Sequence, residues 1–213
     1  MQDCSGSGEK NIFKANMPAL APPEDRLYSS LIGIAGGGGL GSNLALHLCR
    51  MGFKNLLIAD FDIVCPGNLN RQFFFAAQEG MNKTDALKKN LDAVFPGRLS
   101  IKTVTERISS GNAAEIFKDC RVFADCTDRA ETKSEIVAAI LSSLQCPAVS
   151  ASGIGGRLTP ALTSTRELFG GRLTLVGDGE TAEDKGTITT SVCAAAAVMA
   201  ENIYRYCREE IKS

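Results

Sequence analysis

The stretch LIGIAGGGGLGSNLALHLC, residues 31–49, joins a short apolar run to a helix-like segment through a glycine-rich turn. A strand, a glycine turn and a helix in this order are typical of dinucleotide-binding folds. Because glycine has no side chain, and because the first N–H groups of a helix favour negative charge, phosphate oxygens can approach such a turn. We therefore expect a nucleotide to bind at four glycines of the turn, Gly36, Gly38, Gly39 and Gly41.

Apolar runs and helix-like segments continue to alternate along the chain. Further strands are predicted at 55–59, 100–104, 121–124 and 147–150, and helices at 40–49, 82–95, 112–117 and 129–144. This alternation predicts an α/β fold with a doubly wound, mainly parallel, Rossmann-like sheet. Beyond residue 156 the strand candidates 161–165 and 172–176 follow each other without a helix, so we expect a C-terminal antiparallel extension. A polar, glycine-punctuated segment at 177–186 predicts a mobile loop before a last helix at 191–210.

Length and composition are those of one domain with its own core. The chain has 213 residues, 44% of them hydrophobic, and 23 basic against 24 acidic side chains, a balance that does not favour binding to nucleic acid. No apolar run approaches the roughly 20 residues that cross a bilayer, and the first residues lack the features of a signal peptide. We expect a cytoplasmic protein without membrane contact, with a loosely ordered arm at residues 1–25 and a single domain at 26–213.

The eight cysteines show no Cys-x-x-Cys pair. Four-cysteine zinc sites usually contain such close pairs, so we predict no structural zinc. In a cytoplasmic chain of this size we expect reduced and mostly buried thiols.

Charged residues follow the second predicted strand. Asp60 closes that strand, where a carboxylate would lie beside the ribose of a nucleotide held by the glycine turn. The cluster of Asn68, Arg71 and Lys83 is not needed by an ordinary NAD enzyme. Two cations beyond the phosphate turn favour a triphosphate whose charge is neutralised during reaction, although both could simply be solvated at a loop and a helix end.

An acidic position follows the strand at 121–124. Asp128 lies beyond the carboxyl end of this strand, where ligand crevices of doubly wound sheets form, and could hold Mg²⁺ against phosphate oxygens. The alternative is that Asp128 caps the helix that starts at residue 129.

Taken together, these motifs resemble the ThiF/MoeB/HesA superfamily, bacterial relatives of the ubiquitin-activating enzymes, and in particular its short ThiF-type adenylyltransferases. The resemblance covers roughly residues 30 to 210. It depends on the glycine turn at 36–43, the DFD at 60–62, the NLNRQ at 68–72, the GMNK at 80–83 and the DCTD at 125–128.

The resemblance implies ATP-dependent adenylation of the C-terminal Gly-Gly carboxylate of a small ubiquitin-like sulfur carrier protein, with release of pyrophosphate, in thiamine thiazole synthesis or a related sulfur pathway. It also implies a homodimer. Within it, Asp60 would hold the ribose, while Asn68, Arg71 and Lys83 would bind the phosphates and Asp128 the Mg²⁺. Arg71, Lys83 and Asp128 would be the catalytic residues.

Three alternatives stay open at this point. The glycine turn and Asp60 alone would also suit an NAD- or FAD-dependent oxidoreductase. A relative acting in tRNA modification would adenylate a small carboxylate in place of a protein. A non-catalytic homologue would bind the nucleotide or the carrier without turnover.

Overall fold

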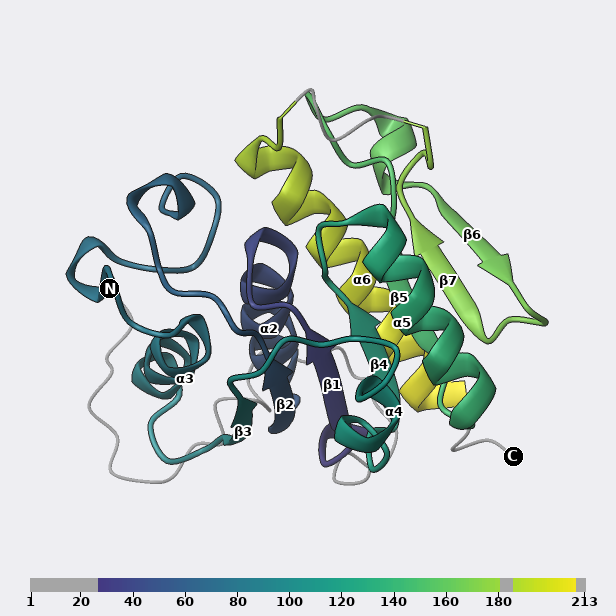
Figure 1. Ribbon diagram of the computed structural model, residues 1–213, viewed down its shortest axis with the longest axis horizontal. Helices are drawn as coiled ribbons and strands as arrows, with labels where there is room; N and C mark the ends of the chain where they lie inside the picture. The colour runs from purple at the N-terminus through teal and green to yellow at the C-terminus, as the bar shows by residue number, and fades with distance from the viewer. Residues whose placement is uncertain (1–26, 181–185, 210–213) are drawn as a thin grey trace, which may run out of the picture.

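A computed structural model describes residues 27–180 and 186–209 of the chain (Figure 1). Its sheet has seven strands in the order β3-β2-β1-β4-β5-β7-β6, and all neighbours are parallel except β6 and β7. The strands are β1 (Leu31–Ala35), β2 (Asn55–Ala59), β3 (Ser100–Val104), β4 (Val122–Asp125), β5 (Ala148–Ala151), β6 (Thr165–Leu168) and β7 (Leu173–Val176). The strand order reverses between β1 and β4, which is where doubly wound sheets form their ligand crevice.

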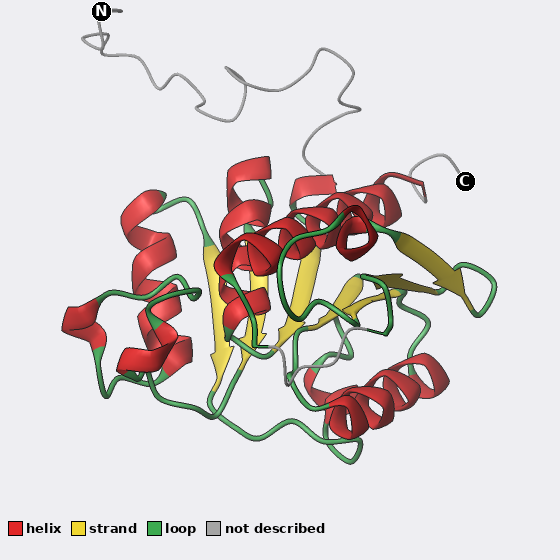
Figure 2. Ribbon diagram, turned by 90° about the horizontal axis from the view of Figure 1, so that it is seen from above, coloured by secondary structure: helices red, strands yellow, loops and turns green. Residues whose placement is uncertain are grey.

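Helices cover both faces of the sheet (Figure 2). The α-helices are α2 (Gly39–Met51), α3 (Lys83–Val94), α4 (Ala113–Ile116), α5 (Ala130–Ser143) and α6 (Thr189–Glu209), and the short 3-10 helices are η1 (Pro66–Asn68), η2 (Ala76–Gln78) and η3 (Pro160–Thr163). One hydrophobic cluster joins the sheet to α2, α3 and α6, and a second joins it to α4 and α5. Within the described residues, no helix combines the length and the apolarity that a bilayer crossing requires.

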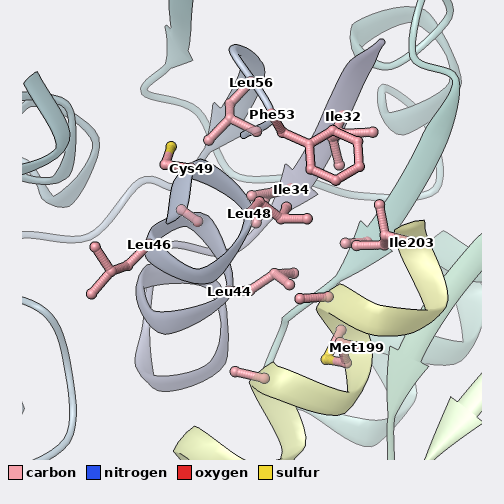
Figure 3. Packing of buried hydrophobic residues seen from close by; sticks show 14 of the residues in the cluster. Ile32, Ile34, Leu44, Leu46, Leu48, Cys49, Phe53, Leu56, Met199 and Ile203 are labelled. Carbon is pink, nitrogen blue, oxygen red and sulfur yellow. The ribbon is translucent and has the colours of Figure 1, made fainter. Parts of the chain in front are cut away.

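The larger cluster is centred on the contact of α2 with α6 (Figure 3). Leu44 and Leu48 of α2 and Met199 and Ile203 of α6 are fully buried there. The α6 segment that approaches α2 is rich in alanine, and small side chains allow the two helices to lie close together. The first turn of α2 is thereby fixed between the sheet and α6.

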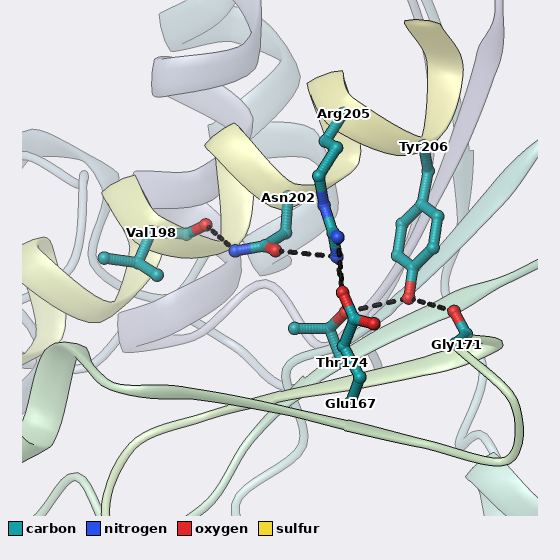
Figure 4. Close-up of polar contacts among 7 residues, drawn as sticks. All are labelled: Glu167, Gly171, Thr174, Val198, Asn202, Arg205 and Tyr206. Carbon is teal, nitrogen blue, oxygen red and sulfur yellow. Dashed lines mark hydrogen bonds and ion pairs between the residues drawn. The ribbon is translucent and has the colours of Figure 1, made fainter. Parts of the chain in front are cut away.

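Polar contacts join α6 to the β6–β7 hairpin (Figure 4). The Tyr206 hydroxyl donates to the carbonyl oxygen of Gly171 at 2.6 Å and shares a hydrogen bond of 2.7 Å with Thr174. Arg205 forms an ion pair with Glu167 of the edge strand β6. The C-terminal helix therefore holds the antiparallel extension against the parallel sheet.

The expected α/β class, the doubly wound parallel sheet and the antiparallel extension are confirmed. Except for one strand, the predicted elements lie within two residues of those observed. The predicted strand at 161–165 is wrong, because these residues mostly form η3 and the strand begins only at Thr165. Pro160, whose φ is fixed near helical values, opens that turn. The predicted arm at 1–25, residues 181–185 of the predicted loop and residue 210 lie outside the described residues.

Candidate functional site

A cleft of about 720 Å³ opens at the carboxyl ends of the central strands. Its walls include the loops that follow five parallel strands: Gly36, Gly38 and Gly39 after β1, and residues 60–62 after β2, 106–108 after β3, 126–130 after β4 and 152–155 after β5. Volumes of roughly 300–1,000 Å³ are usual for sites that bind small molecules or cofactors. The cleft therefore has the position and the size of a nucleotide site.

The glycine turn forms the floor of this cleft. Gly36 has a φ of +95°, and a Cβ atom there would lie 2.7 Å from the carbonyl oxygen of Cys126. Gly41 lies in the first turn of α2, where a Cβ atom would lie only 1.8 Å from the carbonyl oxygen of Gly36. Gly36, Gly38 and Gly39 line the cleft, whereas Gly41 is buried beneath it. Gly41 thus allows the turn to pack on its own helix and leaves ligand contact to the other three.

Asp60 connects the glycine turn to the loop after β2. Its Oδ2 accepts a hydrogen bond from the backbone N–H of Gly37 at 2.6 Å, and its Oδ1 accepts one from Asp62 at 2.7 Å. Burial raises the pKa of the Asp60 carboxyl above its ordinary value, although both N–H donors and the charge of Lys83 oppose the shift. Asp60 lines the cleft, so the carboxylate expected at the ribose also orders the turn expected at the phosphates.

Lys83 enters the cleft from the first residue of α3. Its side chain is 8% exposed, and its Nζ forms an ion pair of 2.8 Å with Oδ2 of Asp62, whose side chain is 47% exposed. The backbone N–H of Lys83 also donates to the carbonyl oxygen of Asp62. The ammonium group is thus held beside the cleft by a carboxylate that water reaches.

Arg71 lies in a loop that α2 fixes in place. The Nδ2 of Asn43 donates to the carbonyl oxygens of Gly39 at 2.7 Å and Arg71 at 2.9 Å, which ties the arginine backbone to the first turn of α2. The Arg71 guanidinium donates to the carbonyl oxygen of Gly67 and to the Asn70 side chain. Arg71 lines the cleft together with Lys83, so the structure brings the two predicted cations to one cavity.

Asn68 does not line the cleft. Its side-chain oxygen accepts a hydrogen bond of 2.9 Å from the backbone N–H of Cys65. The side chain therefore satisfies the backbone N–H of Cys65, the N-cap residue of η1. The contact with phosphate that was expected for Asn68 stays a prediction.

Asp128 is exposed in the loop after β4 and lines the cleft. The N-cap residue of α5 is Arg129, and no side-chain hydrogen bond caps this helix. Among the described residues there is no group of three His, Cys, Asp or Glu side chains that could hold a metal ion. Mg²⁺ is commonly bound by one or two carboxylates together with substrate phosphates, and a single exposed aspartate fits that mode.

Sequence reasoning missed a buried charge network beneath this loop. Asp125 is fully buried at the end of β4, and its Oδ2 accepts from Lys133 Nζ at 2.7 Å and from Ser150 Oγ at 2.6 Å. Its Oδ1 accepts from the backbone N–H and the hydroxyl of Thr127. Asp125 belongs to the DCTD motif, but the predicted strand ended one residue before it, so nothing in the sequence separated its role from that of Asp128.

No disulfide bond links the described cysteines to one another. Four of them, Cys49, Cys120, Cys126 and Cys207, are buried, as expected, whereas Cys65 is exposed. The predicted absence of structural zinc stays a prediction.

The sheet order, the glycine turn and the cleft at the switch point define a doubly wound α/β protein of the nucleotide-binding class. The sequence pattern of the ThiF family matches residues 14–211. The chain therefore belongs to the ThiF family.

Curated relatives cover the chain in part. The adenylyltransferase and sulfurtransferase UBA4 of Candida glabrata is 36% identical over 137 residues, which are 63% of this chain and 31% of the relative. The molybdopterin-synthase adenylyltransferase of Haemophilus influenzae is 32% identical over 114 residues, which are 53% of this chain and 46% of the relative. The match thus spans less than half the length of either relative.

A solved structure shares the fold along most of the chain. The tRNA N6-threonylcarbamoyladenosine dehydratase TcdA of E. coli, solved in complex with AMP, superposes with a TM-score of 0.79 at 18% identity. The superposition covers 89% of this chain and 90% of that one. This likeness concerns the fold alone.

Proposed function

We propose that this protein uses ATP to adenylate a carboxylate, and that the substrate is the C-terminal Gly-Gly carboxylate of a small ubiquitin-like sulfur carrier protein. Membership of the ThiF family and relatives named as adenylyltransferases support this reaction. Thiamine thiazole synthesis or a related sulfur pathway would use the product. We further propose that the enzyme is a cytoplasmic homodimer.

The reaction needs charge neutralisation more than proton transfer. A C-terminal carboxyl has a pKa of about 3.3–3.7 and is already ionised at neutral pH, so no general base is required. A carboxylate oxygen forms a bond to the α-phosphorus of ATP, and the bond from that phosphorus to the pyrophosphate oxygen breaks. The barrier is the repulsion between the two anions together with the charge that develops on the phosphoryl oxygens and on pyrophosphate.

The residues of the cleft suit this task. Gly36, Gly38 and Gly39 would receive the phosphates, and Asp60 the ribose, while Arg71 and Lys83 would offset the negative charge. Asp128 would hold Mg²⁺, which supplies further positive charge at the phosphate oxygens when it is bound. His47 does not line the cleft, in keeping with a mechanism that needs no base.

One observation carries the proposal: Lys83, an almost fully buried lysine, lies in the same cleft as Arg71 and the glycine turn. Its ion-pair partner Asp62 is 47% exposed, so the ammonium group stays available to an anionic ligand at little cost. An oxidoreductase site has no comparable need for two cations beyond the phosphate turn.

Carrier-dependent exchange of labelled pyrophosphate into ATP tests the proposal. We expect exchange with a cognate carrier, and a loss of roughly 100-fold or more for Lys83→Met, since removal of one transition-state charge partner has effects of that order. Lys88→Met is the matched control, because Lys88 is exposed on the same helix. Retained exchange in Lys83→Met would remove Lys83 from the mechanism.

The alternatives predict different outcomes in the same preparation. Exchange that depends on a modified tRNA and on no carrier would favour the tRNA-modification alternative. The structural neighbour TcdA is named as a tRNA N6-threonylcarbamoyladenosine dehydratase. Tight NADH binding without a response to ATP and Mg²⁺ would favour an oxidoreductase. ATP binding without exchange for any carrier or tRNA would leave a non-catalytic homologue.

A further inference from the structure

Arg129 is a cation of the cleft to which the proposed nucleotide contacts give no role. It is the N-cap residue of α5, it is exposed, and it lines the cleft. Its carbonyl oxygen accepts a hydrogen bond of 2.9 Å from the backbone N–H of Lys133, so its backbone is held by the first turn of the helix. Within residues 27–180 and 186–209, its guanidinium forms no hydrogen bond, ion pair or ring contact.

The four other lysine and arginine side chains that line the cleft each contact a group of the protein. These contacts are Arg71 with Gly67 and Asn70, Arg107 with the Phe61 ring, Lys83 with Asp62, and Lys133 with Asp125. Arg129 can therefore bind an anion without losing a contact inside the described protein. A guanidinium group is also the cation best suited to a carboxylate, because two of its N–H groups match the two oxygens.

The position of Arg129 along the cleft separates it from the nucleotide. The loops that line the cleft follow the strand order β3-β2-β1-β4-β5. The proposed nucleotide would place its ribose at Asp60 after β2 and its phosphates at the turn after β1. Arg129 follows β4, which pairs with β1 on the side away from β2. The second substrate has to reach the phosphates from the part of the cleft that the nucleotide leaves open, which is lined by the loops after β4 and β5.

We propose that Arg129 is a substrate-binding residue, whose guanidinium binds the reacting carboxylate of the second substrate. This inference rests on the proposed function, because it takes a carboxylate as the co-substrate of ATP. The pair offsets part of the carboxylate charge while the two anions approach each other. Lys133 cannot easily take this role, because its ammonium group is paired with the fully buried Asp125. Since the pair forms before the reaction, its loss should raise the KM for the carboxylate substrate and leave ATP binding intact.

Titration with two small probes tests the assignment without a carrier protein. Acetyl-Gly-Gly ends in a carboxylate, and its C-terminal amide has the same backbone without the charge. In wild-type protein saturated with the unreactive analogue α,β-methylene-ATP, ligand-observed NMR should show a preference for the carboxylate of roughly 10-fold or more, the range for hydrogen bonds between charged groups. Arg129→Gln should remove most of this preference. Arg129→Lys, which keeps the charge and loses the planar pair of donors, should retain part of it.

Arg157→Gln is the matched control, because Arg157 is exposed and does not line the cleft. It should keep the full preference for the carboxylate. ATP affinity, measured by calorimetry, should stay within about twofold of the wild type in all three variants. Their melting temperatures should equal that of the wild type, because none of them removes a buried contact.

Three results would overturn the role of Arg129. They are an unchanged preference in Arg129→Gln, a wild-type protein that binds both probes equally, and a loss of ATP affinity in Arg129→Gln that matches the loss for the carboxylate. ATP binding and carrier-dependent exchange by the wild type would still support the proposed function in each case. A wild-type protein that did not bind ATP would overturn both.

Discussion

Replacing Asp125 by asparagine should destabilise the protein strongly, because it breaks a buried charge pair while keeping the shape of the side chain. Asp125 is fully buried, and the Lys133 side chain is 13% exposed. Removal of one partner of such a pair typically costs about 3–5 kcal/mol, since the other charge is left without compensation. The asparagine oxygen could still accept from Thr127, and Lys133 has some access to water, so we expect a loss near the lower end, about 3 kcal/mol.

The loss can be measured by urea denaturation and by calorimetry. For a domain of roughly 150–250 residues, 1 kcal/mol shifts the melting temperature by about 2–4 °C, so about 3 kcal/mol corresponds to roughly 6–12 °C. The double variant Asp125→Asn with Lys133→Met removes the uncompensated charge. It should be more stable than the sum of the two single losses predicts, by roughly 1 kcal/mol or more.

Two results would refute this reasoning. A loss below about 1 kcal/mol in Asp125→Asn would mean that the pair contributes no more than an exposed ion pair does. Additive losses in the double variant would mean that the Asp125 carboxylate acts through its other partners, Ser150 and Thr127, and not through Lys133.

Further expectations follow from the glycine contacts and the thiols. Gly41→Ala should cost about 2–3 kcal/mol from overpacking, because its Cβ would lie 1.8 Å from the Gly36 carbonyl oxygen, whereas Gly67→Ala, with nothing within 4 Å, should leave the urea midpoint unchanged; equal midpoints would contradict the close contact. Burial raises the pKa of the Cys49 thiol to about 12, so at pH 8 it should react with a maleimide only after unfolding. Exposed Cys65 should react in the native protein, and mass-spectrometric mapping that found Cys49 modified first would contradict this order.

The fold could be predicted because its signals are local. The glycine turn requires a strand before it and a helix after it, and strands buried on both faces appear as continuous apolar runs, as in β1 and β2. The C-terminal extension was predicted, but its first strand was misplaced by several residues. Edge strand β6 is mostly exposed and has no apolar run to mark it, while Pro160 and Leu162 gave an apolar signal to what is a 3-10 turn.

The site could be predicted only where position and charge coincide. Asp60 and Lys83 line the cleft because strand ends and helix starts meet at one edge of a parallel sheet, and Arg71 joins them from a loop that Asn43 of α2 holds. Asn68 lies in the same motif but bonds its own loop, and Asp125 lies three residues before Asp128 but is buried. Such differences arise from tertiary hydrogen bonds, which neighbouring positions in a motif do not reveal.

The two lysines of the cleft differ most in their acidic partners. Lys83 and Lys133 both line the cavity and both form ion pairs at hydrogen-bonding distance. Asp125 is fully buried and accepts hydrogen bonds on both oxygens, so release of Lys133 would leave a buried carboxylate uncompensated.

Asp62, by contrast, is 47% exposed, and water can replace Lys83 as its partner at little cost. A phosphate group that entered the cleft could therefore replace Asp62 as the ion-pair partner of Lys83. It could not easily replace Asp125 as the partner of Lys133. Asp62 keeps the buried ammonium paired, which limits the cost of holding a cation in the cleft. The exposure of the acidic partner thus separates a lysine available to a ligand from a lysine that holds the loop in place.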